Sequence, residues 1–190
     1  IELSDYKSEA NGRADLEALL EQVFEADIVT DAAIAANLTQ SNEFWALRDH
    51  MTEAQQRAGK NIKHDIAVPV SRIADFVAST NAEIEAKFSG IRMIVFGHLG
   101  DGNLHYNVSP PKGLRGEDFG TIEAAVNRVT HDAVHRFNGS VSAEHGLGVL
   151  RRGEAARYKS AVELGMMRAI KNALDPQGIM NPGKSLGDYE

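Results

Sequence analysis

Two short motifs of the sequence carry side chains that can bind a metal ion. Residues 97–105 have the sequence GHLGDGNLH, and residues 142–146 have the sequence SAEHG. His98, His105 and Glu144 supply two imidazoles and one carboxylate, a donor set that catalytic Zn²⁺ sites use while keeping one position open. From the spacing alone, two histidines that are hydrogen-bonded within a glycine-rich turn explain the first motif equally well.

The adjacent residues Glu144 and His145 favour the metal interpretation. Consecutive residues that leave a strand point in different directions, so Glu144 can face a metal while His145 faces a bound substrate. An imidazole titrates near neutral pH and can accept a proton from a reacting hydroxyl group. This division suits a metal ligand beside a general base.

The composition restricts the ligands and partners. The chain has 190 residues and no cysteine, so histidine nitrogen and carboxylate oxygen must hold any metal. Such donor sets accept Zn²⁺, Mn²⁺ and Fe²⁺, of which we expect Zn²⁺. The formal net charge of -7 argues against a nucleic-acid surface, whose affinity depends on Lys and Arg at phosphates. A small anionic substrate fits where cations are concentrated locally.

Membrane-spanning and nucleotide-binding patterns are not seen in the sequence. No apolar stretch approaches the roughly 20 residues that cross a bilayer, and the amino end has no signal pattern. We therefore expect a soluble, cytoplasmic protein without a transmembrane segment. Neither a GxGxxG motif after a strand nor a GxxxxGK(S/T) motif occurs, so a nucleotide cofactor must be bound largely elsewhere. The chain starts at Ile1, and we interpret it as part of a longer polypeptide.

Apolar periodicity predicts the strands that position the motifs. Residues 91–96 form an apolar run that predicts a buried strand, and the glycines after it allow a tight loop. In the strand that follows, His105 and Asn107 share one face because side chains alternate along a strand. The opposite face carries Leu104, Tyr106 and Val108.

The whole pattern predicts an α+β fold. Helical spacing predicts helices over residues 16–24, 41–58, 71–88, 122–137 and 154–174, and extended segments over residues 1–4, 26–30, 62–70 and 140–143. The expected caps are Ser41 and Ser71, and Gly139 is expected to end the fourth helix. This order is typical of paired split βαβ units, with antiparallel sheets and helices on one face. We treat residues 1–190 as one domain with two possible subdomains.

The other histidines are expected to have structural or surface roles. His131 and His135 have the spacing of a helical metal clamp, but both lie off the apolar stripe and are expected on a solvated face. His50 and His64 have no partners in the sequence, so we expect structural roles for them. Arg48 lies at the edge of a stripe formed by Phe44, Leu47 and Met51, which we expect to be buried. A guanidinium there can bind a carboxylate through two hydrogen bonds.

Together these motifs resemble a known family, the C-terminal domain of FAD-linked oxidases of the vanillyl-alcohol-oxidase type, which includes D-lactate, glycolate and D-2-hydroxyglutarate dehydrogenases. The markers are residues 97–105 with Asn107, residues 142–146, the pair Asp175-Pro176 and the segment Asn181-Pro182-Gly183-Lys184. The resemblance covers nearly the whole chain. It implies a duplicated ferredoxin-like α/β sandwich that caps a separate FAD-binding domain, which is not in these residues.

The resemblance also implies roles for the motif residues. His98, His105 and Glu144 correspond to the ligands of a divalent metal, and His145 corresponds to the general base. Asn107 would touch the substrate or the metal.

A second segment resembles the D-2-hydroxyglutarate dehydrogenase branch of the family. The similarity lies in residues 44–52 and 63–66, and it implies that Arg48, Thr52 and Lys63 bind substrate carboxylates. Asp49 and His64 stand where family members commonly have Glu and Tyr. Asn181 is expected to contact the flavin.

The implied reaction is the oxidation of a D-2-hydroxy acid to a 2-oxo acid. Hydride would pass to FAD on the other domain, and the electrons would then reach an electron-transfer flavoprotein, a quinone or oxygen. The 190 residues alone are expected to have no turnover. Two other functions stay open, a non-catalytic metal-binding module and a ferredoxin-like protein-interaction domain.

Overall fold

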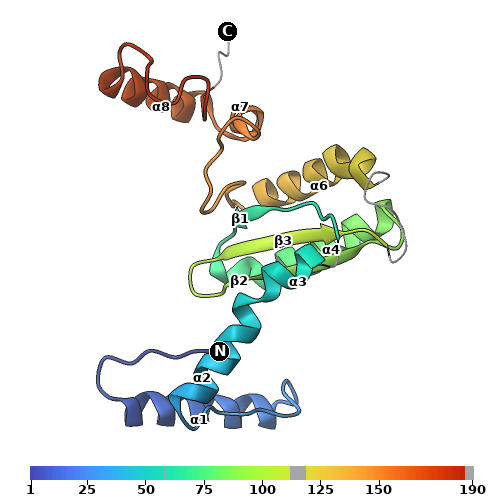
Figure 1. The fold of residues 1–190 in the computed structure, drawn as a ribbon, viewed down its shortest axis with the longest axis vertical. Coiled ribbons are helices and arrows are strands. Elements are labelled where there is room, and N and C mark those ends of the chain that lie inside the picture. The colour runs from blue at the N-terminus through green and yellow to red at the C-terminus, as the bar shows by residue number, and fades with distance from the viewer. Residues whose placement is uncertain (58, 112–118, 187–190) are drawn as a thin grey trace. The chain divides into compact units, whose positions relative to one another are not determined.

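The computed structural model describes residues 1–57, 59–111 and 119–186 (Figure 1). The chain divides into two compact units, Ile1–Glu53 and Ala54–Glu190. In the described residues, no helix has both the length and the apolar character needed to cross a membrane.

Unit 1 is helical. It contains α1 (Glu9–Glu25) and α2 (Leu38–Asp49), and α3 (Met51–Arg57) begins at its end. Each of the first two helices starts where a short polar side chain accepts a hydrogen bond from the first turn. Ser8 accepts from the backbone N–H of Asn11, and Asn37 accepts from that of Gln40.

Several predictions for unit 1 are wrong. Residues 1–4 and 26–30 form no strand. After α1, Asp27 adopts a left-handed φ of 55° and the backbone N–H of Ile28 bonds to the carbonyl of Val23, so the chain turns back. Ser41 lies inside α2, because the capping side chain comes four residues earlier in the sequence. The stripe expected to be buried is exposed at Phe44, Leu47 and Met51.

Unit 2 is built on a three-stranded antiparallel sheet. Its strands are β1 (Asp65–Ala67), β2 (Arg92–His98) and β3 (Asn103–Ser109), in the order β1-β3-β2. β2 and β3 form the predicted hairpin around the glycine-rich loop. The extended segment predicted over residues 140–143 is reduced to one bridge, between Ser140 and Ala67.

Two helices cover one face of this sheet (Figure 1). They are α4 (Ile73–Lys87), which follows the 3-10 turn η1 (Val70–Arg72), and α6 (Glu123–Arg136), which follows the 3-10 turn η2 (Gly120–Ile122). Their apolar stripes pack on alternate residues of the strands, as the predicted periodicity requires. The completely buried side chains of this core include Ile66, Phe76, Ile84, Tyr106, Val108, Val126 and Val134.

Glycine is required at two positions of the β2–β3 hairpin. Gly102 has a φ of 80°, and a Cβ atom added to it would collide with the carbonyl oxygen of Val68. A Cβ atom on Gly97 would collide with the carbonyl oxygen of Asn103. The carboxylate of Asp101 accepts a hydrogen bond of 3.0 Å from the N–H of Asn103, which closes the loop. The loop geometry therefore fixes where β3 begins.

The ends of α4 and α6 differ from the predicted ones. Ser71 lies within η1, and Arg72 precedes α4 without a capping side chain, so the 3-10 turn replaces the expected cap. After α6, Asn138 takes the left-handed conformation, with a φ of 57°. Gly139 instead allows close approach to β1, because a Cβ atom there would collide with the carbonyl oxygen of Ala67.

The long helix predicted over residues 154–174 is two helices. They are α7 (Arg152–Tyr158) and α8 (Ala161–Leu174). Ser160 caps α8 in a capping box with Glu163, and this local signal separates the helices. α8 ends before Asp175-Pro176 as predicted.

The order β1, α4, β2, β3, α6 and the bridging Ser140 is that of one split βαβ unit. This confirms the α+β class, with antiparallel strands and helices on one face. The described residues contain one sheet, and the duplicated ferredoxin-like arrangement stays a prediction.

Candidate metal and substrate site

The face of the sheet that is turned away from α4 and α6 carries polar side chains. Residues directly opposite in an antiparallel ladder share a face, as do residues two apart on one strand. His105 lies opposite both Asp65 and Phe96, and His98 lies opposite Asn103. The prediction that His105 and Asn107 share a face is confirmed. We call this surface the polar face, and it carries Asp65, Phe96, His98, Asn103, His105 and Asn107.

Glu144 and His145 reach the polar face from the segment that follows α6. The Ser140 bridge holds the start of this segment beside β1. A hydrogen bond of 3.2 Å from the N–H of Ala143 to the carbonyl of Asp65 continues the contact. The next two residues therefore leave the edge of β1 at the level of the polar face.

The two sequence motifs meet through their side chains. Nδ2 of Asn103 donates a hydrogen bond to the carboxylate of Glu144, and Asn103 is the ladder partner of His98. The imidazole of His145 lies 6.3 Å from that of His105 between ring centroids. The structure thus places His145 near His105 and links Glu144 to Asn103, the ladder partner of His98.

Asp65 is a site residue that the sequence analysis missed. Its side chain is 3% exposed, and Oδ2 accepts hydrogen bonds from the backbone N–H groups of His145, at 2.9 Å, and Glu144, at 3.1 Å. The same oxygen lies 3.4 Å from Nδ1 of His145. The available signal was a carboxylate within the apolar segment 62–70, because carboxylates are seldom buried without partners.

Opposing effects act on the Asp65 carboxyl group. Burial raises its pKa, but hydrogen bonds from the backbone N–H groups of His145 and Glu144 lower it, and so do the imidazoles of His145 and His105. The net pKa lies below its ordinary value. Asp65 therefore carries a negative charge at neutral pH.

One group of three ionisable side chains in the described residues has ligand atoms that all lie within 4.8 Å of one another. Its members are Asp65, Glu144 and His145. Of the predicted ligands, Glu144 belongs to this group, whereas His98 and His105 lie on the adjacent strands of the polar face outside it.

The residues of the polar face fit a divalent cation. Imidazole nitrogen and carboxylate oxygen are the donors that Zn²⁺, Mn²⁺ and Fe²⁺ accept. Two buried oxygens on the same face, Oδ1 of Asn103 and Oδ1 of Asn107, have no hydrogen-bond partner. Buried acceptors without partners are uncommon, and a cation or its bound water would satisfy them.

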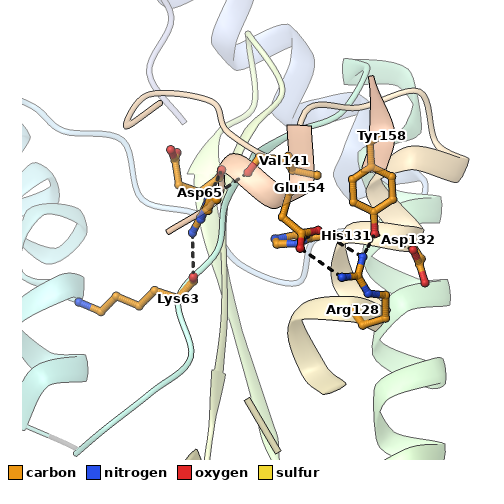
Figure 2. A network of polar contacts seen from close by, with 9 residues as sticks. Lys63, Asp65, Arg128, His131, Asp132, Val141, Glu154 and Tyr158 are labelled. Atoms are coloured by element: carbon orange, nitrogen blue, oxygen red, sulfur yellow. Dashed lines mark hydrogen bonds and ion pairs between the residues drawn. The ribbon is translucent and has the colours of Figure 1, made fainter. Parts of the chain in front are cut away.

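The predicted substrate and flavin residues are placed differently. Asn107 is buried, and its Nδ2 donates a hydrogen bond of 2.8 Å to Gln55. Lys63 is exposed, and its side chain points away from the carboxylate of Asp65 (Figure 2). Asn181 is exposed beyond α8, with a φ of 48°.

Arg48 and Thr52 belong to unit 1. Arg48 is half-buried in the last turn of α2, and Thr52 is exposed in the first turn of α3. Their roles in substrate binding stay predictions.

A second polar network joins α6 to α7 (Figure 2). Arg128 donates hydrogen bonds to the Tyr158 hydroxyl, at 2.7 Å, and to Glu154, at 3.2 Å. The carboxylate of Glu154 also lies 3.0 Å from Nδ1 of His131. His131 is 3% exposed because α7 supplies this partner, so the prediction of a solvated face is wrong for His131. It is confirmed for the exposed His135.

Arg151 ties β1 to the segment that carries the Glu144-His145 turn. Its guanidinium donates to the backbone carbonyls of Val141, at 3.0 Å, and Lys63, at 3.1 Å. It also lies 3.4 Å from the carbonyl of Asp65. The backbone around the site is therefore held independently of the site's own side chains.

His64 has the structural role predicted for it. It is buried, and Nδ1 donates a hydrogen bond of 2.7 Å to the carbonyl of Tyr106, whereas Nε2 has no partner. Burial is the main cause that lowers the pKa of His64, to about 3, and the neighbouring His131 and Arg151 add to the effect.

Comparison with known proteins identifies the family to which this chain belongs. Residues 3–185 match the family model described as FAD linked oxidases, C-terminal domain. The chain belongs to this family. The match covers both motifs and β1, so the polar face is part of an FAD-linked oxidase domain.

Curated relatives of this FAD-linked oxidase domain are named as D-2-hydroxyglutarate dehydrogenases. The mitochondrial protein of Arabidopsis thaliana is 40% identical over 94% of this chain and 30% of the relative. The protein of Xanthomonas citri pv. viticola is 37% identical over 95% of this chain and 37% of the relative. The mitochondrial protein of Danio rerio is 36% identical over 91% of this chain and 31% of the relative. The chain spans about a third of the length of these relatives.

Proposed function

We propose that this chain is the substrate- and metal-binding part of an FAD-dependent dehydrogenase that oxidises a D-2-hydroxy acid to the 2-oxo acid. The observation that carries the proposal is the polar face, where Glu144 and His145 are fixed beside two strand histidines. The names of the relatives favour D-2-hydroxyglutarate as the substrate, with D-lactate as the other candidate.

The proposed division of labour is between two domains. Residues 1–190 would form the C-terminal substrate domain, with a duplicated ferredoxin-like arrangement. FAD would be bound mainly by a second domain, equivalent to the part of the relatives that this chain does not span. Asn181 would contact the flavin from this chain.

His98, His105 and Glu144 would hold the divalent cation, for which Zn²⁺ is our first choice and Mn²⁺ or Fe²⁺ the alternatives. When bound, such a cation lowers the pKa of a substrate hydroxyl group and orients it. The partnerless Oδ1 of Asn107 lies on the same face, and Asn107 would touch the substrate or the metal.

His145 would accept the proton of the substrate hydroxyl group at its Nε2. Loss of that proton and of hydride from Cα, which flavin accepts, converts the hydroxy acid into the oxo acid. Arg48, Thr52 and Lys63 would bind substrate carboxylates, which fixes the direction in which Cα presents its hydrogen.

The remaining partners follow from the proposed reaction. Reduced flavin must pass its electrons on, to an electron-transfer flavoprotein or a quinone. Some of the relatives are named as mitochondrial, and the cytoplasmic location expected from the sequence stays a prediction.

A chimera tests the proposal. The matching segment of the Xanthomonas citri relative would be replaced by this chain, and the bleaching of flavin absorbance by D-2-hydroxyglutarate and by D-lactate would be followed in a stopped-flow instrument. We expect reduction by one of the two acids and a loss on metal removal. His145→Ala should slow flavin reduction about 10²-fold to 10⁴-fold, the usual contribution of a general base.

His135→Ala is the matched control, because His135 is an exposed histidine of α6, away from the polar face. It should leave the rate of flavin reduction unchanged. A chimera that retains FAD and metal but is reduced by neither acid would contradict the dehydrogenase and favour the non-catalytic metal-binding module.

A further inference from the structure

A buried carboxylate lies directly behind the proposed general base. The side chain of Asp65 is 3% exposed, whereas that of His145 is 68% exposed. The carboxylate is thus closed to solvent, and the imidazole in front of it is open to a bound substrate. Burial of a charge is costly unless partners compensate for it, so the groups that contact the Asp65 carboxylate indicate its role.

The carboxylate of Asp65 first fixes the backbone of the turn. Its Oδ2 accepts hydrogen bonds from two consecutive N–H groups, those of Glu144 and His145. These bonds set where the Cα atoms of both residues lie relative to β1. A metal ligand and a base on adjacent residues are then positioned by one group.

The same carboxylate faces one nitrogen of the His145 ring. Oδ2 lies 3.4 Å from Nδ1, which is ion-pair distance. A carboxylate accepts hydrogen bonds, so the neutral imidazole is favoured with its proton on Nδ1. Nε2 then has a free lone pair, as a general base requires.

The strand register also places Asp65 beside His105, one of the proposed metal ligands. Asp65 lies opposite His105 on β3, and the ring of His105 lies 6.3 Å from that of His145. The carboxylate therefore has three neighbours among the proposed site residues. Its backbone hydrogen-bond partners are Glu144 and His145, and its partner on the strand ladder is His105.

We propose that Asp65 is a positioning residue that holds the Glu144-His145 turn on β1 and keeps the proton of the neutral His145 ring on Nδ1. This inference rests on the proposed function only where it calls Nε2 the proton acceptor. The tautomer and the hydrogen bonds of the turn are properties of the 190-residue chain itself.

The fold offers a way to change this carboxylate without releasing the backbone. Arg151 binds the carbonyls of Val141 and Lys63, and the Ser140 bridge pairs with β1. The variant Asp65→Ala removes the oxygen that accepts from the turn and faces Nδ1 of His145, while Arg151 and the Ser140 bridge still hold the segment on β1. Without this acceptor, the exposed ring returns to the Nε2–H tautomer that a neutral histidine side chain prefers in water.

The first experiment measures the tautomer. The chain, labelled with nitrogen-15 in histidine, would be studied by NMR at mildly alkaline pH with a chelator present. We expect the Nδ1–H tautomer for His145 in the wild-type chain and the Nε2–H tautomer in Asp65→Ala. Asp175→Ala is the matched control, because Asp175 also accepts hydrogen bonds from two backbone N–H groups but lies beyond α8. It should leave the signals of His145 unchanged.

The second experiment uses the chimera described above. Asp65→Ala should lower kcat about 10²-fold or more and change KM less than about threefold, because substrate binding does not require the tautomer. The exposed Asp75→Ala on α4 should change neither.

The outcomes separate this inference from the proposed function. An Nε2–H tautomer in the wild-type chain overturns the inference even if Asp65→Ala does not fold. An unchanged tautomer or an unchanged kcat in Asp65→Ala overturns it too. A chimera without any turnover contradicts the dehydrogenase, while the NMR result still decides the role of Asp65 in positioning.

Discussion

Acid should destabilise unit 2 in part through the buried imidazole of His64. Burial favours the neutral ring and lowers its pKa from 6.5 to about 3. The unfolded chain therefore binds a proton on this group at a higher pH than the folded chain does. Stability contributed by the neutral ring is complete above the ordinary pKa and declines as the pH falls from there towards the folded-state pKa.

The size of the effect follows from the two pKa values. At about pH 5 the unfolded imidazole is protonated and the folded one is neutral, and the pH lies about 1.5 pH units below the ordinary value. One such unit corresponds to about 1.4 kcal/mol, so His64 should lower the free energy of unfolding by about 2 kcal/mol relative to about pH 8.

The assay is urea unfolding at about pH 8 and about pH 5, compared between the wild-type chain and His64→Asn. The Asn amide can donate to the carbonyl of Tyr106 as Nδ1 does, but it does not titrate in this range. The amide signal of Val108 in β3 should be followed, because the single Trp lies at position 45, in unit 1.

The pKa of His131 is also lowered, mainly by burial, so protonation of this ring opposes folding as well. It does so in both proteins, and the difference between wild type and variant isolates His64. The wild-type chain should lose about 2 kcal/mol more than the variant between the two pH values. Equal losses in the two proteins would refute the assignment of a neutral, buried imidazole.

Three further substitutions test how the elements around the site are held, each by the free energy of unfolding. Gly102→Ala should destabilise unit 2 by about 2 kcal/mol or more, because the φ is positive and the added Cβ collides with Val68; a tolerated alanine would contradict the loop geometry. Phe76→Ala empties a completely buried position and should cost about 3 to 5 kcal/mol, whereas a cost below about 1 kcal/mol would mean that α4 does not pack as described. Ser160→Ala removes the capping box with Glu163 and should lower α8 stability, measured by local hydrogen exchange, by about 1 kcal/mol, with no change in exchange for β3.

The hairpin and its faces could be predicted from the sequence because local rules decide them. Alternation places His105 and Asn107 on one side and the apolar residues on the other, and glycines mark the turn. The stripes of α4 and α6 are likewise visible in the sequence, and the predicted stripe residues Phe76, Ile84, Val126 and Ala133 are buried.

The wrong predictions have two causes. One is a contact with a residue distant in sequence, and the other is a competing local signal. His131 is buried because Glu154 reaches it from α7, more than twenty residues later. Ser71 is displaced as a cap by the 3-10 turn that follows Pro69. Asp65 could not be recognised as a site residue, because its partners in the Glu144-His145 turn lie some eighty residues away.

His64, which directly precedes β1, and Asp65, its first residue, show how the fold keeps the two faces of the sheet apart. The ring of His64 contacts His131 of α6 at 5.5 Å between centroids, on the side of the helices, whereas Asp65 faces the site. A shift of β1 by one residue would move the ionised carboxylate into the core and the imidazole out of it, which burial of the charge opposes. The register that satisfies the core is therefore also the register that delivers Asp65 to the turn, and the backbone bonds from Arg151 hold β1 in that register.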